Sequence, residues 1–122
     1  MAGYHGPIDS LTKQNTNFRQ VLFTAPHSQL VLMSLLPQEE IGLEMHDVDQ
    51  FFRFEQGQGT VVIGDNSFEV KDGDAVVIPA GSYHNITNTS ATESLKLYTI
   101  YSPAHHPDGT VHKTKAEAEA SE

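Results

Sequence analysis

The sequence has 122 residues and a formal net charge of −9, from 16 acidic and 7 basic residues. This length predicts one domain with a single core, and the negative charge argues against nucleic-acid backbones and anionic membranes as partners, because both require a basic footprint. The absence of cysteine excludes disulfides, thiolate metal ligands and thiol nucleophiles.

Residues 1–17 are polar and weakly patterned. They lack the charged and apolar regions of a signal peptide, and no apolar run in the chain approaches membrane-spanning length, so we expect a cytoplasmic protein. We predict that this segment is an N-terminal arm, which either lies across the domain or pairs with a neighbouring molecule.

From residue 18 to residue 102 the chain is a succession of short apolar runs separated by turns. The expected strands are FRQVLFTA (18–25), SQLVLMSLL (28–36), FFRFE (51–55), TVVIG (60–64), FEV (68–70), AVVIP (75–79), YHNITN (83–88) and LKLYTIYS (95–102). The stretches "GDNS" and "KDGD" between them are turn signals. Many short strands at close spacing predict an all-β sandwich or barrel over residues 18–102.

Residues 103–122 form a predicted C-terminal tail. Helix is expected only here, over TKAEAEA (114–120). The tail also contains His105, His106 and His112. These histidines either fold over the mouth of the barrel, as a lid or as proton carriers, or remain solvated.

Three side chains that can coordinate a metal precede a run of phenylalanines: Glu44, His46 and Gln50. They are either an accident of polar sequence or one half of a metal site. A second half is available at His84, which follows a predicted buried strand and the turn at Gly81. A histidine that faces the interior at a strand edge needs a hydrogen-bond partner or a metal.

The segment "GDAVVIPAGSYHNITN" resembles the second sequence motif of the cupins, G-x5-P-x-G-x2-H-x3-N. It matches every fixed position of that motif, through Gly73, Pro79, Gly81, His84 and Asn88. The first cupin motif, G-x5-H-x-H-x3-4-E-x6-G, aligns upstream in an altered form. The spacing is kept, but the ligand positions read Glu44, His46 and Gln50, the leading glycine is Gln38, and the closing glycine is Gly57.

The resemblance covers roughly residues 28–102 and implies a small single-domain cupin of the RmlC-like type, a double-stranded β-helix or jelly-roll barrel with one internal site. Small cupins commonly pair their terminal strands, which implies a homodimer. The tail is similar to that of a group loosely labelled mannose-6-phosphate isomerase-like. That label implies a sugar-phosphate substrate, but the pocket segments show no basic cluster to hold a phosphate.

The altered ligand set is chemically consistent. A glutamate replaces a histidine at position 44 and a neutral glutamine replaces the glutamate at position 50, so the set again carries one negative charge. Glu44, His46, Gln50 and His84 are therefore expected to hold one divalent transition metal per chain, of which Fe, Mn, Ni, Co and Zn all suit such ligands.

Three functions remain open from the sequence. The first is a metalloenzyme, an isomerase, dioxygenase or lyase, that acts on a small oxygenated organic or sugar-derived substrate. The second is a cupin that binds or senses a small-molecule ligand without turnover, and the third is a metal-free scaffold. Phe52 and Phe54 alternate with the same period as Gln50, so they are expected to point inward with it and to line the pocket. Tyr98 is also expected to point inward on its strand.

Overall fold

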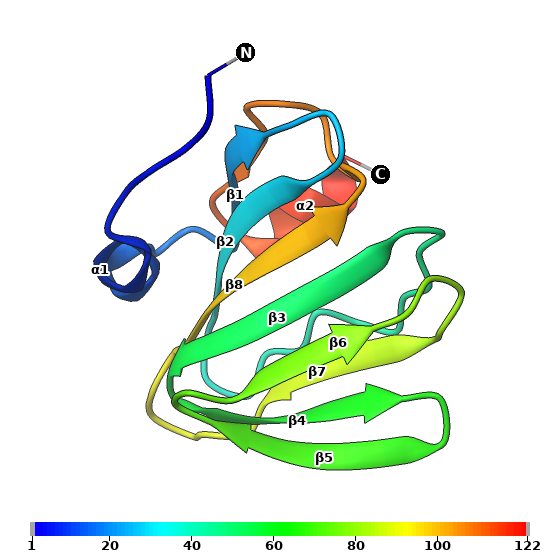
Figure 1. The fold of residues 1–122 in the computed structure, drawn as a ribbon. Coiled ribbons are helices and arrows are strands. Elements are labelled where there is room, and N and C mark those ends of the chain that lie inside the picture. Colours follow the sequence, from blue (N-terminus) through cyan, green and yellow to red (C-terminus); the bar gives the residue numbers. More distant parts are fainter. Residues whose placement is uncertain (1, 122) are drawn as a thin grey trace.

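The computed structural model describes residues 2–121 and shows two antiparallel β-sheets that face each other (Figure 1). The elements are α1 (Ile8–Gln14), β1 (Arg19–Thr24), β2 (Gln29–Leu35), β3 (Asp49–Gln56), β4 (Gln58–Ile63), β5 (Asn66–Lys71), β6 (Ala75–Ile78), β7 (His84–Asn88), β8 (Leu95–Ser102), β9 (Val111–His112) and α2 (Lys115–Ala120). Strands β1 to β8 correspond to the eight predicted apolar runs, so the predicted all-β jelly roll is confirmed.

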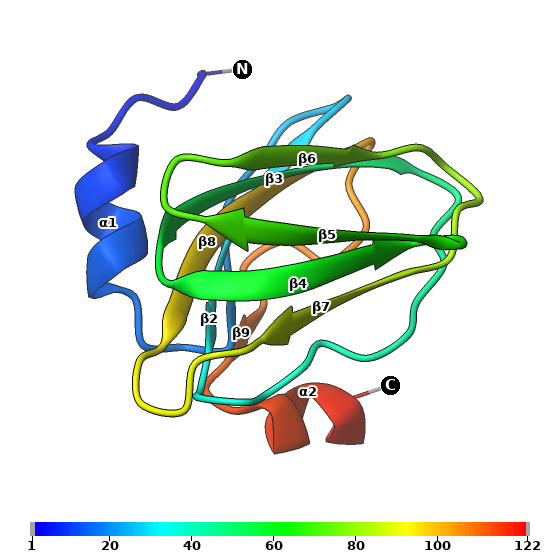
Figure 2. The same cartoon turned by 90° about the horizontal axis from the view of Figure 1, so that it is seen from below.

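The larger sheet has the strand order β6-β3-β8-β2-β1-β9, and the smaller one has the order β5-β4-β7 (Figure 2). The core fills the space between their inner faces. Phe54 of β3, Leu97 of β8, Val61 of β4 and Ile86 of β7 are all 0% exposed. These side chains occupy alternate positions on their strands, as expected for strands with one face toward a core.

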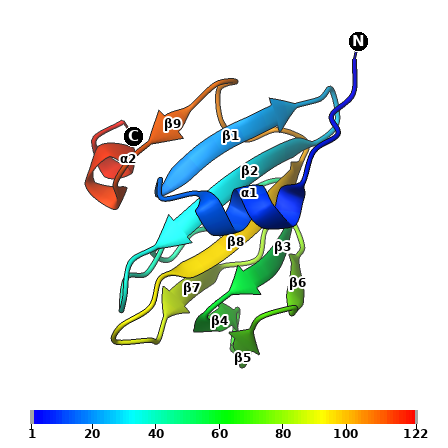
Figure 3. The same cartoon turned by 90° about the vertical axis from the view of Figure 1, so that its left-hand side faces the viewer.

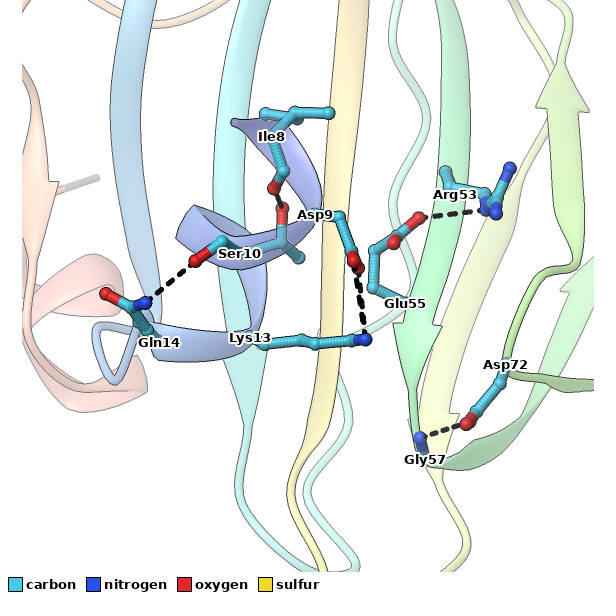
Figure 4. A network of polar contacts seen from close by, with 10 residues as sticks. Ile8, Asp9, Ser10, Lys13, Gln14, Arg53, Glu55, Gly57 and Asp72 are labelled. Carbon is cyan, nitrogen blue, oxygen red and sulfur yellow. Dashed lines mark hydrogen bonds and ion pairs between the residues drawn. The ribbon is translucent and has the colours of Figure 1, made fainter. Parts of the chain in front are cut away.

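The prediction that helix occurs only near the C-terminus is wrong, because Ile8–Gln14 forms α1. This helix lies across the outer face of the larger sheet, against β8 and β3 (Figure 3). It is held by polar contacts at helical spacing, such as the Asp9–Lys13 ion pair at 3.2 Å (Figure 4). The helix has one buried residue, Thr12, so it lacks the apolar periodicity by which a helix is detected in a sequence.

The C-terminal segment contributes a strand as well as the predicted helix. Strand β9 pairs with β1 and extends the larger sheet, and the tail prediction does not include it because only Val111 and His112 take part. Helix α2 confirms the predicted C-terminal helix. Its first turn is capped by the Thr114 hydroxyl, which accepts a hydrogen bond from Glu117 N at 3.2 Å. Within residues 2–121, neither helix is long and apolar enough to cross a membrane.

Gln38, which stands where the cupin motif has its leading glycine, has a left-handed backbone conformation with φ of 65°. It follows Pro37 in a turn closed by a 3.0 Å hydrogen bond from Glu39 N to Leu36 O. Proline at the second position and positive φ at the third are the features of a type II turn, in which the third position favours glycine. Glycine is therefore favoured at this position of the motif because it adopts positive φ without strain, whereas Gln38 does not.

Replacing Gln38 with glycine is expected to raise the free energy of unfolding by about 0.5–1 kcal/mol, because the relief of left-handed strain exceeds the added backbone entropy of the unfolded chain. Urea unfolding monitored by circular dichroism measures the change. Gln58→Gly is the matched control: Gln58 is exposed in β4, so the same substitution there is expected to destabilise the protein. A loss of stability in Gln38→Gly would contradict the strain argument.

Candidate metal centre

The segment between β2 and β3 runs antiparallel to β7 and carries two of the predicted ligands. It is an irregular extended segment tied to β7 by isolated bridges, not a regular strand. Glu44 lies opposite His84, and their backbones exchange two hydrogen bonds, Glu44 N to His84 O and His84 N to Glu44 O, each 2.9 Å long. A further hydrogen bond, from Gly81 N to His46 O at 2.8 Å, holds His46 beside the turn that leads into β7.

This pairing brings Glu44, His46 and His84 into one cluster. Each side chain offers a ligand atom, and these atoms lie within 4.8 Å of one another. His46 Nε2 is 3.7 Å from Glu44 Oε2, and the rings of His46 and His84 are 5.3 Å apart between centroids. His46 is 9% exposed and His84 is 3% exposed. The cluster therefore places two imidazoles and one carboxylate around one point at the end of the barrel.

The His84 ring is oriented for coordination. Its Nδ1 lies 3.0 Å from the backbone carbonyl of Ser82. Because a carbonyl only accepts hydrogen bonds, Nδ1 carries the proton and Nε2 has the free lone pair. This Nε2 is buried and has no hydrogen-bond partner. A hydrogen bond on one ring nitrogen that leaves the other free is the usual arrangement of a metal-binding histidine.

Gln50 lies on the inner face of β3, opposite Tyr101 of β8. Its Nε2 donates to Thr99 Oγ1 at 3.0 Å, whereas its Oε1 is buried without a hydrogen-bond partner. The amide is thus anchored through its nitrogen and presents an unsatisfied oxygen. The two buried atoms without a hydrogen-bond partner, Gln50 Oε1 and His84 Nε2, are both acceptors, and a cation would satisfy them. The residues therefore fit a bound metal ion.

The electrostatic environment keeps His46 neutral. Burial lowers its pKa to about 4, and the neighbouring basic groups of His105, His84 and Arg19 act in the same direction. At neutral pH the ring is therefore unprotonated. A histidine must be neutral to coordinate a metal, so this shift favours binding.

The three predicted pocket residues have different positions. Phe52 and Phe54 share the inward parity of Gln50, and their stacked rings, with centroids 6.4 Å apart, form part of the core next to it. The prediction that Tyr98 points inward is wrong. Its ring lies on the opposite face of β8 from Thr99 and Tyr101, 6.3 Å from the ring of Phe51.

His105 lies against the cluster although it is itself exposed, and His106 lies beside His105. The ring of His105 is 4.1 Å from that of His46 between centroids. The backbone N–H groups of His105 and His106 donate to Gln29 Oε1 at 3.1 and 3.0 Å, and Gln29 Nε2 donates to His106 O at 2.8 Å. Gln29 is 1% exposed, so a buried amide fixes this part of the tail.

Tyr101 connects the tail to the interior. Its hydroxyl lies 3.3 Å from His106 Nε2, and its ring is 5.9 Å from that of His46. Burial raises the pKa of Tyr101 far above its usual range, so the phenol stays protonated. Burial also lowers the pKa of His106, to about 3, and lowers that of His105. Neutral, proton-carrying groups therefore surround the centre.

A cavity of about 550 Å³ opens beside the cluster. The residues that line it include Arg19, Glu44, His105, His106 and His112. A hollow of about 620 Å³ elsewhere on the surface is lined by residues of β4 and β5 and contains no member of the cluster, so we place the site at the former. Arg19 is the functional candidate that the sequence does not reveal, since a single arginine in a predicted strand has no motif around it.

Comparison with known proteins agrees with this fold. A family model described as "Cupin domain" matches residues 31–101. The uncharacterized protein YrkC of Bacillus subtilis is 52% identical over 122 residues, which cover 94% of this chain and 65% of that protein. The uncharacterized protein L612 of Acanthamoeba polyphaga mimivirus is 49% identical over 104 residues, covering 82% of this chain and 65% of that protein. The chain thus spans just under two thirds of the length of these curated relatives.

A solved structure resembles nearly the whole chain. The crystal structure of BH2720 from Bacillus halodurans superposes with a TM-score of 0.95 at 46% identity, covering 98% of this chain and 95% of that one. An RmlC-like cupin from Shewanella frigidimarina superposes with a TM-score of 0.67 at 19% identity over 72% of this chain and 77% of that one, which supports the fold alone. Because the two curated relatives are uncharacterized, the comparisons give a family and not a reaction.

Proposed function

Because this chain belongs to the cupin domain family, we propose that it is a metalloenzyme whose divalent transition metal is held by Glu44, His46 and His84, with Gln50 at a fourth position. The proposed substrate is a small oxygenated organic molecule, and the cavity beside the cluster is its binding site. The donor set suits Fe, Mn, Ni, Co or Zn. When bound, such a metal supplies a Lewis acid that polarises an oxygen of the substrate.

The observation that carries the metal is the buried, unpartnered Nε2 of His84, in a cluster with Glu44 and His46 whose ligand atoms lie within 4.8 Å of one another. Leaving a buried acceptor unsatisfied costs about 1–3 kcal/mol. A cation bound to the free Nε2 of His84 would remove this cost. The Nδ1 of the same ring is held by a carbonyl, as is usual for a histidine that binds a metal.

Turnover, rather than ligand storage, is supported by the groups around the cluster. His105 packs on His46 and lines the cavity, yet it is not a member of the ligand cluster. Tyr101, a buried phenol beside the His46 ring, stays protonated because burial raises its pKa, so it acts as a hydrogen-bond donor behind the cavity wall. General acid–base chemistry needs a titratable group within reach of the substrate and separate from the metal ligands, and His105 is the group proposed for it.

Titration of the metal-free protein with Zn²⁺ and Co²⁺ tests this proposal. Calorimetry is expected to give about one ion per chain, and the Co²⁺ absorption bands report the coordination number. Gln50→Ala is expected to weaken Zn²⁺ binding by about tenfold, the size of effect of removing a supporting polar group. Gln50→Glu is expected to restore or strengthen binding, because a carboxylate is a better ligand than an amide.

Gln58→Ala is the control for this series, since Gln58 is exposed in β4 and lines the other hollow, which contains no member of the cluster. No uptake of either ion by the wild-type protein would refute the metal. One bound ion, with identical Zn²⁺ affinity in wild type, Gln50→Ala and Gln50→Glu, would remove Gln50 from the ligand set.

A further inference from the structure

A buried arginine faces the cavity beside the metal centre. Arg19 begins β1, is 5% exposed, and lines the same cavity as Glu44. Its Nη1 lies 3.3 Å from His112 Nδ1, and its guanidinium carbon is 5.3 Å from the centroid of the Phe18 ring. Tyr101 is a further hydrogen-bonding neighbour of the guanidinium, none of these three groups is an anion, and Nε is buried without a hydrogen-bond partner. Burial of a cation in this way is costly unless a complementary group joins it.

Arg19 is the permanent cation among the described residues that line the cavity. Its charge helps to lower the pKa values of His105 and His106, after the larger effect of burial, so both imidazoles are neutral at neutral pH. His112 Nδ1 accepts from the guanidinium, since arginine has only donors. The cavity wall therefore carries one fixed positive charge, and the Nε–H of the same guanidinium is buried without a partner.

We propose that Arg19 binds the carboxylate of a small organic acid, and that a second oxygen of this ligand faces the cluster of Glu44, His46 and His84. The planar fork of a guanidinium matches a carboxylate through two parallel hydrogen bonds. The volume of about 550 Å³ lies in the range of pockets that hold small molecules. This inference names the substrate class of the proposed function and in that sense rests on it, but binding at Arg19 does not itself require the metal.

The charge balance favours a carboxylate over a phosphate. Glu44 and Glu117 also line the cavity, and the whole chain has a net charge of −9. Any anion here faces one cation and two carboxylates. A carboxylate adds one negative charge to this cavity and a phosphate adds about two, so the repulsion from Glu44 and Glu117 is smaller for the carboxylate, and a neutral hydroxyl or carbonyl oxygen on the same ligand adds none.

Titration of the metal-free protein with lactate tests this inference, with lactamide as the neutral analogue. Nuclear magnetic resonance follows the Arg19 Nε–H signal. Lactate is expected to shift this signal with saturation, and lactamide to bind at least about tenfold more weakly, because it lacks the charge-assisted hydrogen bonds. Arg19→Gln is expected to weaken lactate binding by about tenfold or more, and Arg19→Lys to give an intermediate affinity, since it keeps the charge but not the fork.

Arg53→Gln is the matched control, because Arg53 carries the same charge on the outer face of the larger sheet, paired with Glu55 at 2.9 Å, and its loss is expected to leave lactate affinity unchanged (Figure 4). Equal affinity for lactate and lactamide, or tighter binding of inorganic phosphate than of lactate, would overturn the inference. These wild-type comparisons remain decisive even where an Arg19 variant does not fold. Zn²⁺ binding without selectivity for lactate refutes this inference alone, and selectivity for lactate without Zn²⁺ binding refutes only the metal.

Discussion

His84→Ala is expected to lower the affinity for Zn²⁺ by more than about a hundredfold, since changes to groups that merely support a ligand already cost 10–100-fold. The substitution removes the buried Nε2 that has no partner in the protein. Glu44 and His46 remain, but they are neighbours on one irregular segment and enclose an ion from one side only. Calorimetric titration with Zn²⁺ and elemental analysis of the purified variant measure the loss.

The fold of this variant is expected to persist in the absence of metal. The backbone bridge between Glu44 and residue 84 does not depend on the side chain. The truncation leaves a small cavity but also removes an unsatisfied buried nitrogen, so the two contributions to stability oppose each other. Circular dichroism and urea unfolding of the metal-free proteins separate loss of the ligand from loss of the fold.

His27→Ala is the matched control for His84→Ala, because His27 is exposed in the turn between β1 and β2. Its Zn²⁺ affinity is expected to equal that of the wild type. If His84→Ala and His27→Ala bind Zn²⁺ equally well, the ion lies elsewhere in the chain and the cluster is a set of buried polar groups without a metal.

The fold was accessible from the sequence because its signals are local. Turns and alternating apolar residues specify each strand separately, and the second cupin motif fixes a long stretch of chain at once. Within that motif, Gly73 and Gly81 both have positive φ, of 89° and 83°, so the glycines are required by the backbone. His84 and Asn88 share the inward face of β7, which makes their spacing of four residues a structural requirement as well.

The sequence does not show which residues of β8 point toward the core, because both faces of this strand are covered. On its outer face, Lys96 is only 8% exposed and donates to Asn15 O at 2.6 Å and to Ser34 Oγ at 2.9 Å, next to α1. On its inner face, a polar residue, Thr99, accepts the Gln50 amide. The pattern of apolar and polar residues therefore does not distinguish the two faces of β8, and the sequence predicts the wrong face for Tyr98.

The outer half of the site depends on long-range contacts that leave no local pattern. The tail histidines are placed by one buried amide, that of Gln29, more than seventy residues away in the chain. Arg19 reaches the cavity because β9 pairs with β1 and brings His112 beside it. Neither contact follows from spacing in the sequence, which therefore indicates the cluster of Glu44, His46 and His84 but not the residues around it.

Asn88→Ala is expected to destabilise the protein by about 3 kcal/mol, because several buried hydrogen bonds are lost together. Asn88 is 1% exposed, and its Nδ2 donates to the backbone carbonyls of Leu35, Leu36 and Glu93 at 3.1, 3.1 and 2.8 Å. Its Oδ1 accepts from Ser90 N at 2.9 Å. One side chain thus joins the end of β7 to the chain after β2 and to the loop before β8. Urea unfolding of the metal-free protein measures the change.

Asn88→Asp separates the two halves of this network. It keeps the acceptor for Ser90 N but replaces the donor by a carboxylate that faces three carbonyls, so its loss of stability is expected to be at least as large. Ser67→Ala, at an exposed position of β5, is expected to change stability by less than about 0.5 kcal/mol. A loss below about 1 kcal/mol in Asn88→Ala would contradict the structural role. Because Asn88 lies at the opposite end of β7 from His84, folded Asn88→Ala is expected to bind Zn²⁺ with wild-type affinity, which separates the motif's structural asparagine from its ligand histidine.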